Sequence, residues 1–357
     1  MSSVGVISYR QPVEGCYTLA IAGPVVLGGH MRRREFITLL GGTAVAWPGL
    51  AHAQKAPIRI AFLVAGAAAS ATSARQLDDI KRGLRENGLI EDQDYVLDAR
   101  FADGNYERFP ELARELAQAG ARVILVNTIA SVRAAQNLNP PVAVVMLAIN
   151  DPVGSGLVAS LARPGGYTTG TASLMEDLTP KLIEFQREVL PKATTIAALF
   201  NPANPTNPKF LANLQTAASP MGMQVLPVAL KSPDELDSVF STLMAQHPDA
   251  LQPVADSGTL DLMDRIAALA LAHRLPSFST LSGYARFGGL LTYGIDGRKV
   301  VVRTSFFVKR ILAGAKPGDL PVEQPTKIEL AINLRTAKAL GLSISPTLLS
   351  RADEVIE

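Results

Sequence analysis

Short, almost uniformly apolar segments alternate with amphipathic ones from residue 57 to the end of the chain. Ile58–Val64 has the composition of a strand that is buried on both faces. In the next segment, Ala74–Asn87, the side chains of Leu77, Ile80 and Leu84 recur at the spacing of a helix. Apolar strands separated by helices are typical of parallel sheets covered by helices on both faces. The sequence therefore predicts an α/β fold.

The alternation runs through the chain twice. The first series extends to a strand at Val142–Leu147, and the second begins with a strand at Thr195–Phe200. We therefore predict two Rossmann-like lobes with parallel sheets. The periodic pattern lapses at Ser173–Thr179, at Ser279–Gly283 and near Pro317–Pro325, so we expect three hinge crossings there.

These crossings define the predicted boundaries of the lobes. The first lobe is expected to take residues 57–173 and 282–317, and the second residues 174–281 and 318–357. About two domains are also what a chain of roughly 300 residues predicts.

Residues 31–53 have the three parts of an export signal. Arg32–Arg34 are basic, Phe36–Leu50 is apolar but interrupted by glycine and proline, and Ala51–Ala53 is a small-x-small cleavage site. The apolar part is shorter than the roughly 18 residues of a membrane span. The paired arginines before a phenylalanine are typical of twin-arginine export, but Thr38 replaces the usual lysine, so the general secretory route stays open.

Cleavage is expected near Ala53-Gln54, followed by residence in the periplasm. Residues 1–30 are interpreted as an upstream extension that is not native or is disordered, with Met31 as the true start.

Loss of residues 1–53 would restrict the chemistry that the chain can perform. They hold four arginines and two glutamates, so the remainder carries 30 basic and 30 acidic side chains and offers no basic surface for nucleic acid. The only cysteine, Cys16, and the only tryptophan, Trp47, also lie there, which leaves His247 and His273 as the histidines. We expect no cofactor, no Cys/His metal site and no cysteine nucleophile, although a site made of carboxylates alone stays open.

Two sequence patterns that suggest an enzyme are weak. Gly154–Ala159 fits the G-x-G-x-x-A dinucleotide pattern and Glu176 follows at a suitable distance, but Ala148–Val153 separates the pattern from its strand. No G-x-S-x-G motif is present, and His247 and His273 stand at element ends. The sequence therefore does not predict an enzyme.

Polar, small or aromatic residues follow several of the predicted strands. Ligands of open α/β sheets bind outside the carboxyl ends of the strands. The residues that we predict to bind a ligand there are Gly66, Ser70, Thr128, Ser131, Asn150, Asp151, Asn201, Asn204, Asp256, Ser257 and Tyr293. Each is separately a typical loop-capping residue, but together they predict a cleft.

The chemistry of this set suits a small zwitterion or carboxylate. Thr128 and Ser131 begin a helix, where free N–H groups attract an anion. Asp256 on the opposing lobe would hold an ammonium group, because a desolvated charge needs an opposite partner. Tyr293 offers an aromatic face and a hydroxyl.

Several long stretches resemble ABC transporter substrate-binding proteins of the tryptophan/tyrosine-binding type. The resemblance rests on Asp151–Gly166 (DPVGSGLVASLARPGG), Gln324–Leu342 (QPTKIELAINLRTAKALGL) and the tail Pro346–Glu357. Asn201–Pro205 and Thr292–Gly294 are similar to further family features. The resemblance extends from about residue 57 to the end.

The resemblance implies a type I periplasmic-binding fold that binds a small amino-acid-like or carboxylate solute between its lobes and performs no catalysis. It also implies an ABC permease in the inner membrane, with its ATPase, as partner, and we expect a monomer. Asp256 falls where the family has an acidic residue, whereas Ala65–Ser70 is poorer in serine than usual and Gln252-Pro253 interrupts an apolar strand. These departures leave the identity of the solute open. A periplasmic enzyme exported in the folded state and a sensor-type binding module remain the alternatives.

Overall fold

The strands and helices follow the alternation of apolar and amphipathic segments. The computed structural model describes residues 56–357 except 174, 205, 255 and 282, and for residues 176, 257 and 258 it describes the backbone only. The expected export signal and upstream extension lie outside the described residues. In the part of the chain that is described, no helix has the length and apolarity that crossing a bilayer requires.

The first lobe is built on a parallel sheet with the strand order β2-β1-β3-β4-β5. Ile60 of β1 pairs with Leu97 of β2 on one side and with Val123 of β3 on the other. The elements of this lobe are β1 (Ile58–Val64), α2 (Ala71–Glu86), β2 (Tyr95–Phe101), α3 (Phe109–Gln118), β3 (Val123–Val126), α4 (Ile129–Gln136), β4 (Ala143–Asn150), β5 (Thr168–Ser173) and, from far downstream, α10 (Gly297–Leu312).

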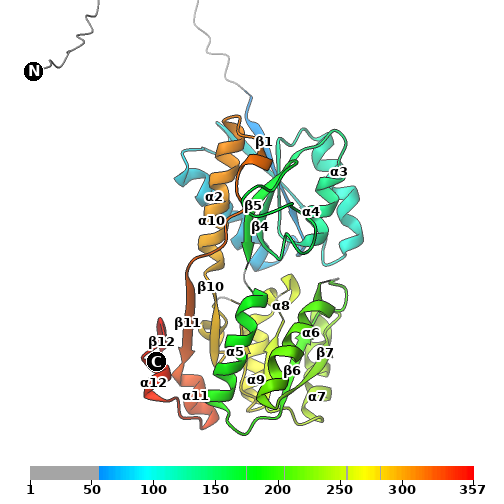
Figure 1. Cartoon of the computed structure of the whole chain (residues 1–357). Helices are drawn as coiled ribbons and strands as arrows, with labels where there is room; N and C mark the ends of the chain where they lie inside the picture. Colours follow the sequence, from blue (N-terminus) through cyan, green and yellow to red (C-terminus); the bar gives the residue numbers. More distant parts are fainter. Residues whose placement is uncertain (1–55, 174, 205, 255, 282) are drawn as a thin grey trace, which may run out of the picture. The chain divides into compact units, whose positions relative to one another are not determined.

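Both faces of this sheet are covered, as uniformly apolar strands require. Phe62 packs with Leu84 of α2 and Phe307 of α10, whereas the next residue, Leu63, packs on the opposite face with Leu116 of α3. Figure 1 shows α2 and α10 on one side of the sheet and α3 and α4 on the other.

The second lobe contains two groups of strands, ordered β7-β6-β8 and β12-β11-β10-β9. A bridge between Leu251 and Ser277 connects them. Its elements are α5 (Met175–Val189), β6 (Thr195–Phe200), α6 (Asn207–Ala218), β7 (Gln224–Ala229), α7 (Leu236–Met244), β8 (Ala250–Pro253), α8 (Ser257–Asp261), α9 (Met263–Ala272), β9 (Phe278–Ser279), β10 (Leu291–Ile295), β11 (Ile328–Asn333), α11 (Leu334–Leu340), α12 (Pro346–Leu349) and β12 (Glu354–Ile356).

The helices of the second lobe also cover both faces of the strands. Ile196 of β6 packs with Phe185 of α5 and Leu214 of α6, and the neighbouring Ala197 packs on the other face with Phe240 of α7 and Ile266 of α9. The α/β fold with parallel sheets that the sequence predicts is confirmed. The pairing of β10 with β11 is antiparallel and is an exception to the parallel arrangement.

The crossings between the lobes differ in part from the expected positions. The first lies between β5, which ends at Ser173, and α5, which begins at Met175, so most of the expected stretch Ser173–Thr179 is helical. The second was expected at Ser279–Gly283, but β10 pairs with β9 and β11, so the chain stays in the second lobe until Ile295. The third follows Glu323, whose bridge to Thr171 of β5 keeps it with the first lobe. Residues 283–295 therefore belong to the second lobe and residues 318–323 to the first.

Candidate functional site

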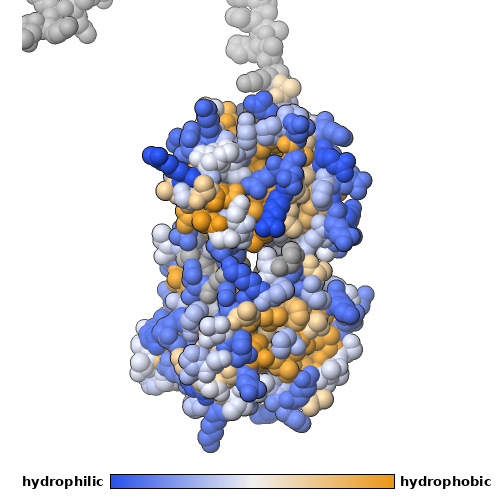
Figure 2. Space-filling model, turned by 45° about the vertical axis from the view of Figure 1, so that its right-hand side comes forward, coloured by the Kyte–Doolittle hydropathy of each residue, from blue (hydrophilic) through white to orange (hydrophobic). Residues whose placement is uncertain are grey.

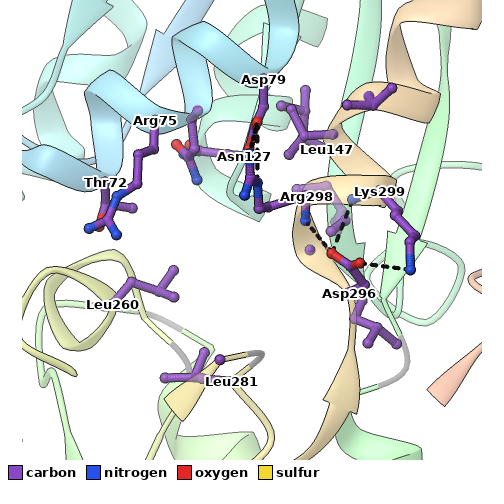
Figure 3. Close-up of a pocket in the computed structure, with 18 of the residues that line it drawn as sticks. Thr72, Arg75, Asp79, Asn127, Leu147, Leu260, Leu281, Asp296, Arg298 and Lys299 are labelled. Atoms are coloured by element: carbon purple, nitrogen blue, oxygen red, sulfur yellow. Dashed lines mark hydrogen bonds and ion pairs between the residues drawn. The ribbon is translucent and has the colours of Figure 1, made fainter. Parts of the chain in front are cut away.

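A cleft of about 1240 Å³ lies between the two lobes. The first lobe lines it with α2, the start of α4, the end of β4 and α10, and the second lobe lines it with residues that follow β6, β8 and β9. Figure 2 shows the surface hollowed between the lobes, and Figure 3 shows side chains from both lobes facing the opening. The predicted residues that line the cleft are Thr128, Asn150, Asn204 and Asp256.

Asp256 is a buried carboxylate that receives hydrogen bonds from both lobes. Its Oδ1 accepts from Nδ2 of Asn201 (3.1 Å), and its Oδ2 accepts from Nδ2 of Asn204 (2.8 Å). The hydroxyl of Tyr106, in the first lobe, also donates to Oδ2 (3.0 Å). The backbone N–H of Asp256 donates to Thr259 Oγ1 (3.0 Å), which fixes the start of α8. The carboxylate is thus held in place at the cleft wall with only 5% of the residue exposed.

The N-terminus of α4 is capped by its own side chains, but two of its backbone amides donate to no described residue. The amide of Ser131 donates to Thr128 Oγ1 and the amide of Thr128 donates to Ser131 Oγ, both over 3.1 Å. Ser131 is fully buried in this capping box and does not line the cleft. The amides of Ile129 and Ala130 donate to no described residue, and Ile129 lines the cleft. These amides, and not the Ser131 side chain, can therefore face an anion.

Asn150 and Asp151 follow β4 but have different surroundings. Asn150 lines the cleft, and its Oδ1 accepts from Ser173 Oγ (3.1 Å). Asp151 does not line it, because its carboxylate pairs with Nζ of Lys209 in the second lobe (2.6 Å) and accepts from the amide of Gly154 (2.8 Å). The hydrogen bond from Lys209 holds the pKa of the Asp151 carboxyl below its usual value, against the opposing effect of partial burial.

A family model for ABC transporter substrate binding proteins matches residues 59–356. The chain belongs to this family. It shares 25% identity over 270 residues with a curated tyrosine-binding protein of Clostridioides difficile (strain R20291), covering 74% of this chain and 77% of that protein. The resemblance predicted from the sequence is thereby confirmed.

Solved structures show the same fold for this substrate-binding protein. A conserved domain protein of Vibrio cholerae O1 biovar El Tor matches with a TM-score of 0.75 and 23% identity, over 84% of this chain and 99% of that chain. A Streptococcus pneumonia ABC domain in complex with L-Trp matches with a TM-score of 0.72 and 23% identity, over 83% of this chain and 100% of that chain. The type I periplasmic-binding fold predicted from the sequence is confirmed.

The remaining predicted residues of the substrate-binding protein lie off the cleft wall. Ser70 caps α2, and its Oγ donates to Asp261 Oδ1 of the second lobe (2.5 Å). Gly66 precedes this cap and does not line the cleft, and Asn201 supports Asp256 from behind.

Tyr293 and Ser257 complete the predicted set. The ring of Tyr293, in β10, meets the ring of Phe185 edge-on with centroids 5.1 Å apart, so it packs within the second lobe. Ser257 begins α8, and its side chain is not described.

Several residues of the cleft wall were missed from the sequence. Tyr106 lies in a short 3-10 turn, Tyr106–Arg108, and Asn127 directly follows β3, a position at which polar residues were otherwise selected. Arg75 lies near the start of the helix α2, where an arginine normally faces solvent. Leu260 and Leu281 form apolar parts of the wall (Figure 3).

The described residues contain no group of three or more histidine, cysteine, aspartate or glutamate side chains that could hold a metal ion. The polar chemistry of the described cleft wall is therefore carried by carboxylates, amides, hydroxyls and cationic side chains.

Proposed function

We propose that this substrate-binding protein captures a small amino acid, or a closely related carboxylate, between its lobes and delivers it to an ABC permease. The observation that carries the proposal is the environment of Asp256. A carboxylate that is almost fully buried at a cleft wall, and that accepts hydrogen bonds from both lobes, is suited to a ligand ammonium group.

The rest of the cleft supports the same kind of solute. The amides at the start of α4 that donate to no described residue would donate to the solute carboxylate, because a helix N-terminus carries a partial positive charge. Leu260 and Leu281 would contact an apolar side chain. The curated relative is named for tyrosine, and one solved relative holds L-Trp, which agrees with an amino acid as solute.

Binding is coupled to closure of the lobes. At about 1240 Å³ the cleft exceeds the roughly 300–1000 Å³ of sites that enclose a small ligand. A solute that contacts both lobes gains additional contacts when they approach, and only this difference shifts the population toward the closed form.

The proposal includes residence in the periplasm after removal of residues 31–53, with cleavage at Ala53-Gln54. The protein acts there as a monomer that binds its solute without changing it, and an inner-membrane permease with its ATPase completes transport. N-terminal sequencing of the exported protein should begin at Gln54.

The experiment is calorimetric titration of the full chain with L-tyrosine, L-tryptophan and the other amino acids. Asp256→Asn keeps the size of the side chain but removes its charge, and should weaken binding of the identified amino acid by about 10- to 100-fold. Asp234→Asn, at an exposed aspartate outside the cleft, is the matched control. Unchanged affinity in Asp256→Asn, or a chemically altered solute after incubation, would contradict the proposal.

A further inference from the structure

Several cations line the cleft, and within the described part of the chain all but one of them form ion pairs. The paired side chains are Arg82 with Asp79 (2.8 Å), Arg286 with Glu354 (2.8 Å), Arg298 with Asp79 (3.5 Å), Lys299 with Asp296 (3.0 Å) and Arg303 with Glu323 (2.7 Å). Arg75 is the exception, because no carboxylate of a described residue pairs with it.

The position of Arg75 is fixed from both lobes. Its Nε donates to the carbonyl of Ala71 in the same helix (3.1 Å), and its guanidinium lies 5.9 Å from the ring centroid of Phe287 in the second lobe. Its terminal nitrogens donate to no described residue. Figure 3 shows the side chain extending from α2 toward Leu260 and Leu281 across the opening.

Closure of the lobes would change the surroundings of this cation. Phe287, which is 40% exposed, and the two leucines are apolar residues of the same cleft wall, which would displace water from the guanidinium when the lobes approach. A desolvated cation requires an anion. The two free terminal nitrogens of an arginine fit the two oxygens of a carboxylate, which a lysine cannot match in geometry.

We propose that Arg75 binds a second carboxylate, carried on the tail of the solute. The solute would then be an amino acid with an acidic side chain, whose ammonium group lies at Asp256 and whose tail lies over Leu260, Leu281 and Phe287. This inference rests on the proposed function, since it describes the far end of the same solute.

The test compares acids with amides of the same shape. Calorimetric titration of the full chain with L-glutamate and L-glutamine, and with 4-carboxy- and 4-carbamoyl-L-phenylalanine, gives an acid-to-amide affinity ratio for each pair. We expect the acid of at least one pair to bind about tenfold more tightly or better, which corresponds to about 1.4 kcal/mol. Arg75→Gln should abolish the difference, and Arg75→Lys should retain part of it.

Arg114→Gln is the matched control. Arg114 is also an exposed helical arginine whose Nε donates to a carbonyl one turn earlier, that of Pro110 (3.2 Å), but it lies outside the cleft. It should leave the ratio unchanged.

The results that would contradict the role of Arg75 differ from those that would contradict the proposed function. Equal binding of acid and amide, or a preference that survives in Arg75→Gln, overturns the role of Arg75. If neither acid binds while L-tyrosine or L-tryptophan does, this inference fails and the proposed function stands. If none of these amino acids binds, both proposals fail.

Discussion

The hydroxyl of Tyr106 donates to Oδ2 of Asp256 over 3.0 Å and joins a turn of the first lobe to a strand end of the second. The ring of Tyr106 stacks on the buried ring of Phe109, with centroids 5.4 Å apart and an interplanar angle of 14°. The core of the first lobe therefore sets the position of a hydroxyl that reaches the second lobe.

Tyr106→Phe tests this contact, because it keeps the ring and removes the donor. We expect the free energy of unfolding to fall by about 1 kcal/mol, the usual net contribution of one hydrogen bond. Urea unfolding measures the change. Tyr167→Phe, at a tyrosine that is 54% exposed, is the control and should have no effect. Equal stabilities of the two variants would contradict the proposed importance of the contact.

The pair formed by Asp151 and Lys209 predicts a dependence on pH. The hydrogen bond from Lys209 lowers the pKa of Asp151 in the folded protein, so the stabilisation is present above the ordinary aspartate pKa of about 4 and is lost as the pH falls through the lowered value. Both side chains are partly exposed, so the contribution at pH 7 is at most about 1 kcal/mol.

Urea unfolding of the wild type and Lys209→Met at pH 7, 5 and 3 checks this prediction. The difference in unfolding free energy should favour the wild type at pH 7 and shrink below pH 4. A difference that persists or grows on acidification would show that Lys209 stabilises the protein through other contacts.

Gln186 and Gln252 form an isolated amide pair in the second lobe. Both are fully buried, and Nε2 of Gln186 donates to Oε1 of Gln252 (2.7 Å), while the other amide atom of each has no partner among the described residues. Gln252→Leu alone leaves the buried Gln186 amide without its hydrogen-bond partner and should lower the free energy of unfolding by about 1–3 kcal/mol.

The double variant Gln186→Leu/Gln252→Leu removes both polar groups and should recover most of that loss. A double-mutant cycle in urea measures the coupling between the two sites. If the loss of unfolding free energy in the double variant equals the sum of the losses in the two single variants, the two amides stabilise the lobe independently.

Gly294 of β10 lies against the loop that forms the second-lobe side of the cleft. A Cβ at this position would stand 2.2 Å from the carbonyl oxygen of Thr280, which lines the cleft. Gly294→Ala should therefore displace Thr280 and Leu281, lower the unfolding free energy by about 1–3 kcal/mol and weaken solute binding. Calorimetry and urea unfolding give the two readouts.

Gly297→Ala is the control for this variant. A Cβ at Gly297, three residues later, meets no atom within 4 Å, so alanine should be tolerated at the start of α10. Equal behaviour of the two alanine variants would argue against the crowding at Gly294.

The strands were the most predictable part of the fold, because burial on both faces leaves a continuous apolar signal. Ile58–Val64 and Thr195–Phe200 have the bounds that the sequence predicts. Helix ends were less predictable. The pair Thr179-Pro180 has the form of an N-cap followed by proline at the first helical position, but α5 begins earlier, at Met175, and includes Pro180.

The second crossing was misplaced for a similar reason. The aperiodic stretch after β9 leads to a 3-10 turn, Tyr284–Phe287, in which Tyr284 is fully buried, and the chain then returns to the same group of strands as β10. A lapse in periodicity marks a loop, but it does not show to which lobe the loop returns.

The candidate site was predictable where polar residues lie within a few positions after a strand, as Asn204 does after β6 and Asp256 after β8. Arg75 was not, because in sequence it is equivalent to a solvent-facing helical arginine such as Arg114. The two arginines differ in the folded protein, where the second lobe places the aromatic ring of Phe287 opposite Arg75.

Helix α10 belongs to the first lobe but follows most of the second lobe in the chain. The order in which the elements are synthesised therefore differs from the order in which the lobes can be completed. The ribosome completes β1 to β5 long before Gly297–Leu312 emerges, so only α2 can cover the sheet face that carries Phe62 and Val145 while the second lobe is made. No contiguous fragment of the gene encodes a finished first lobe, and a circular permutant that begins near α10 would be the simplest way to make one in a single stretch.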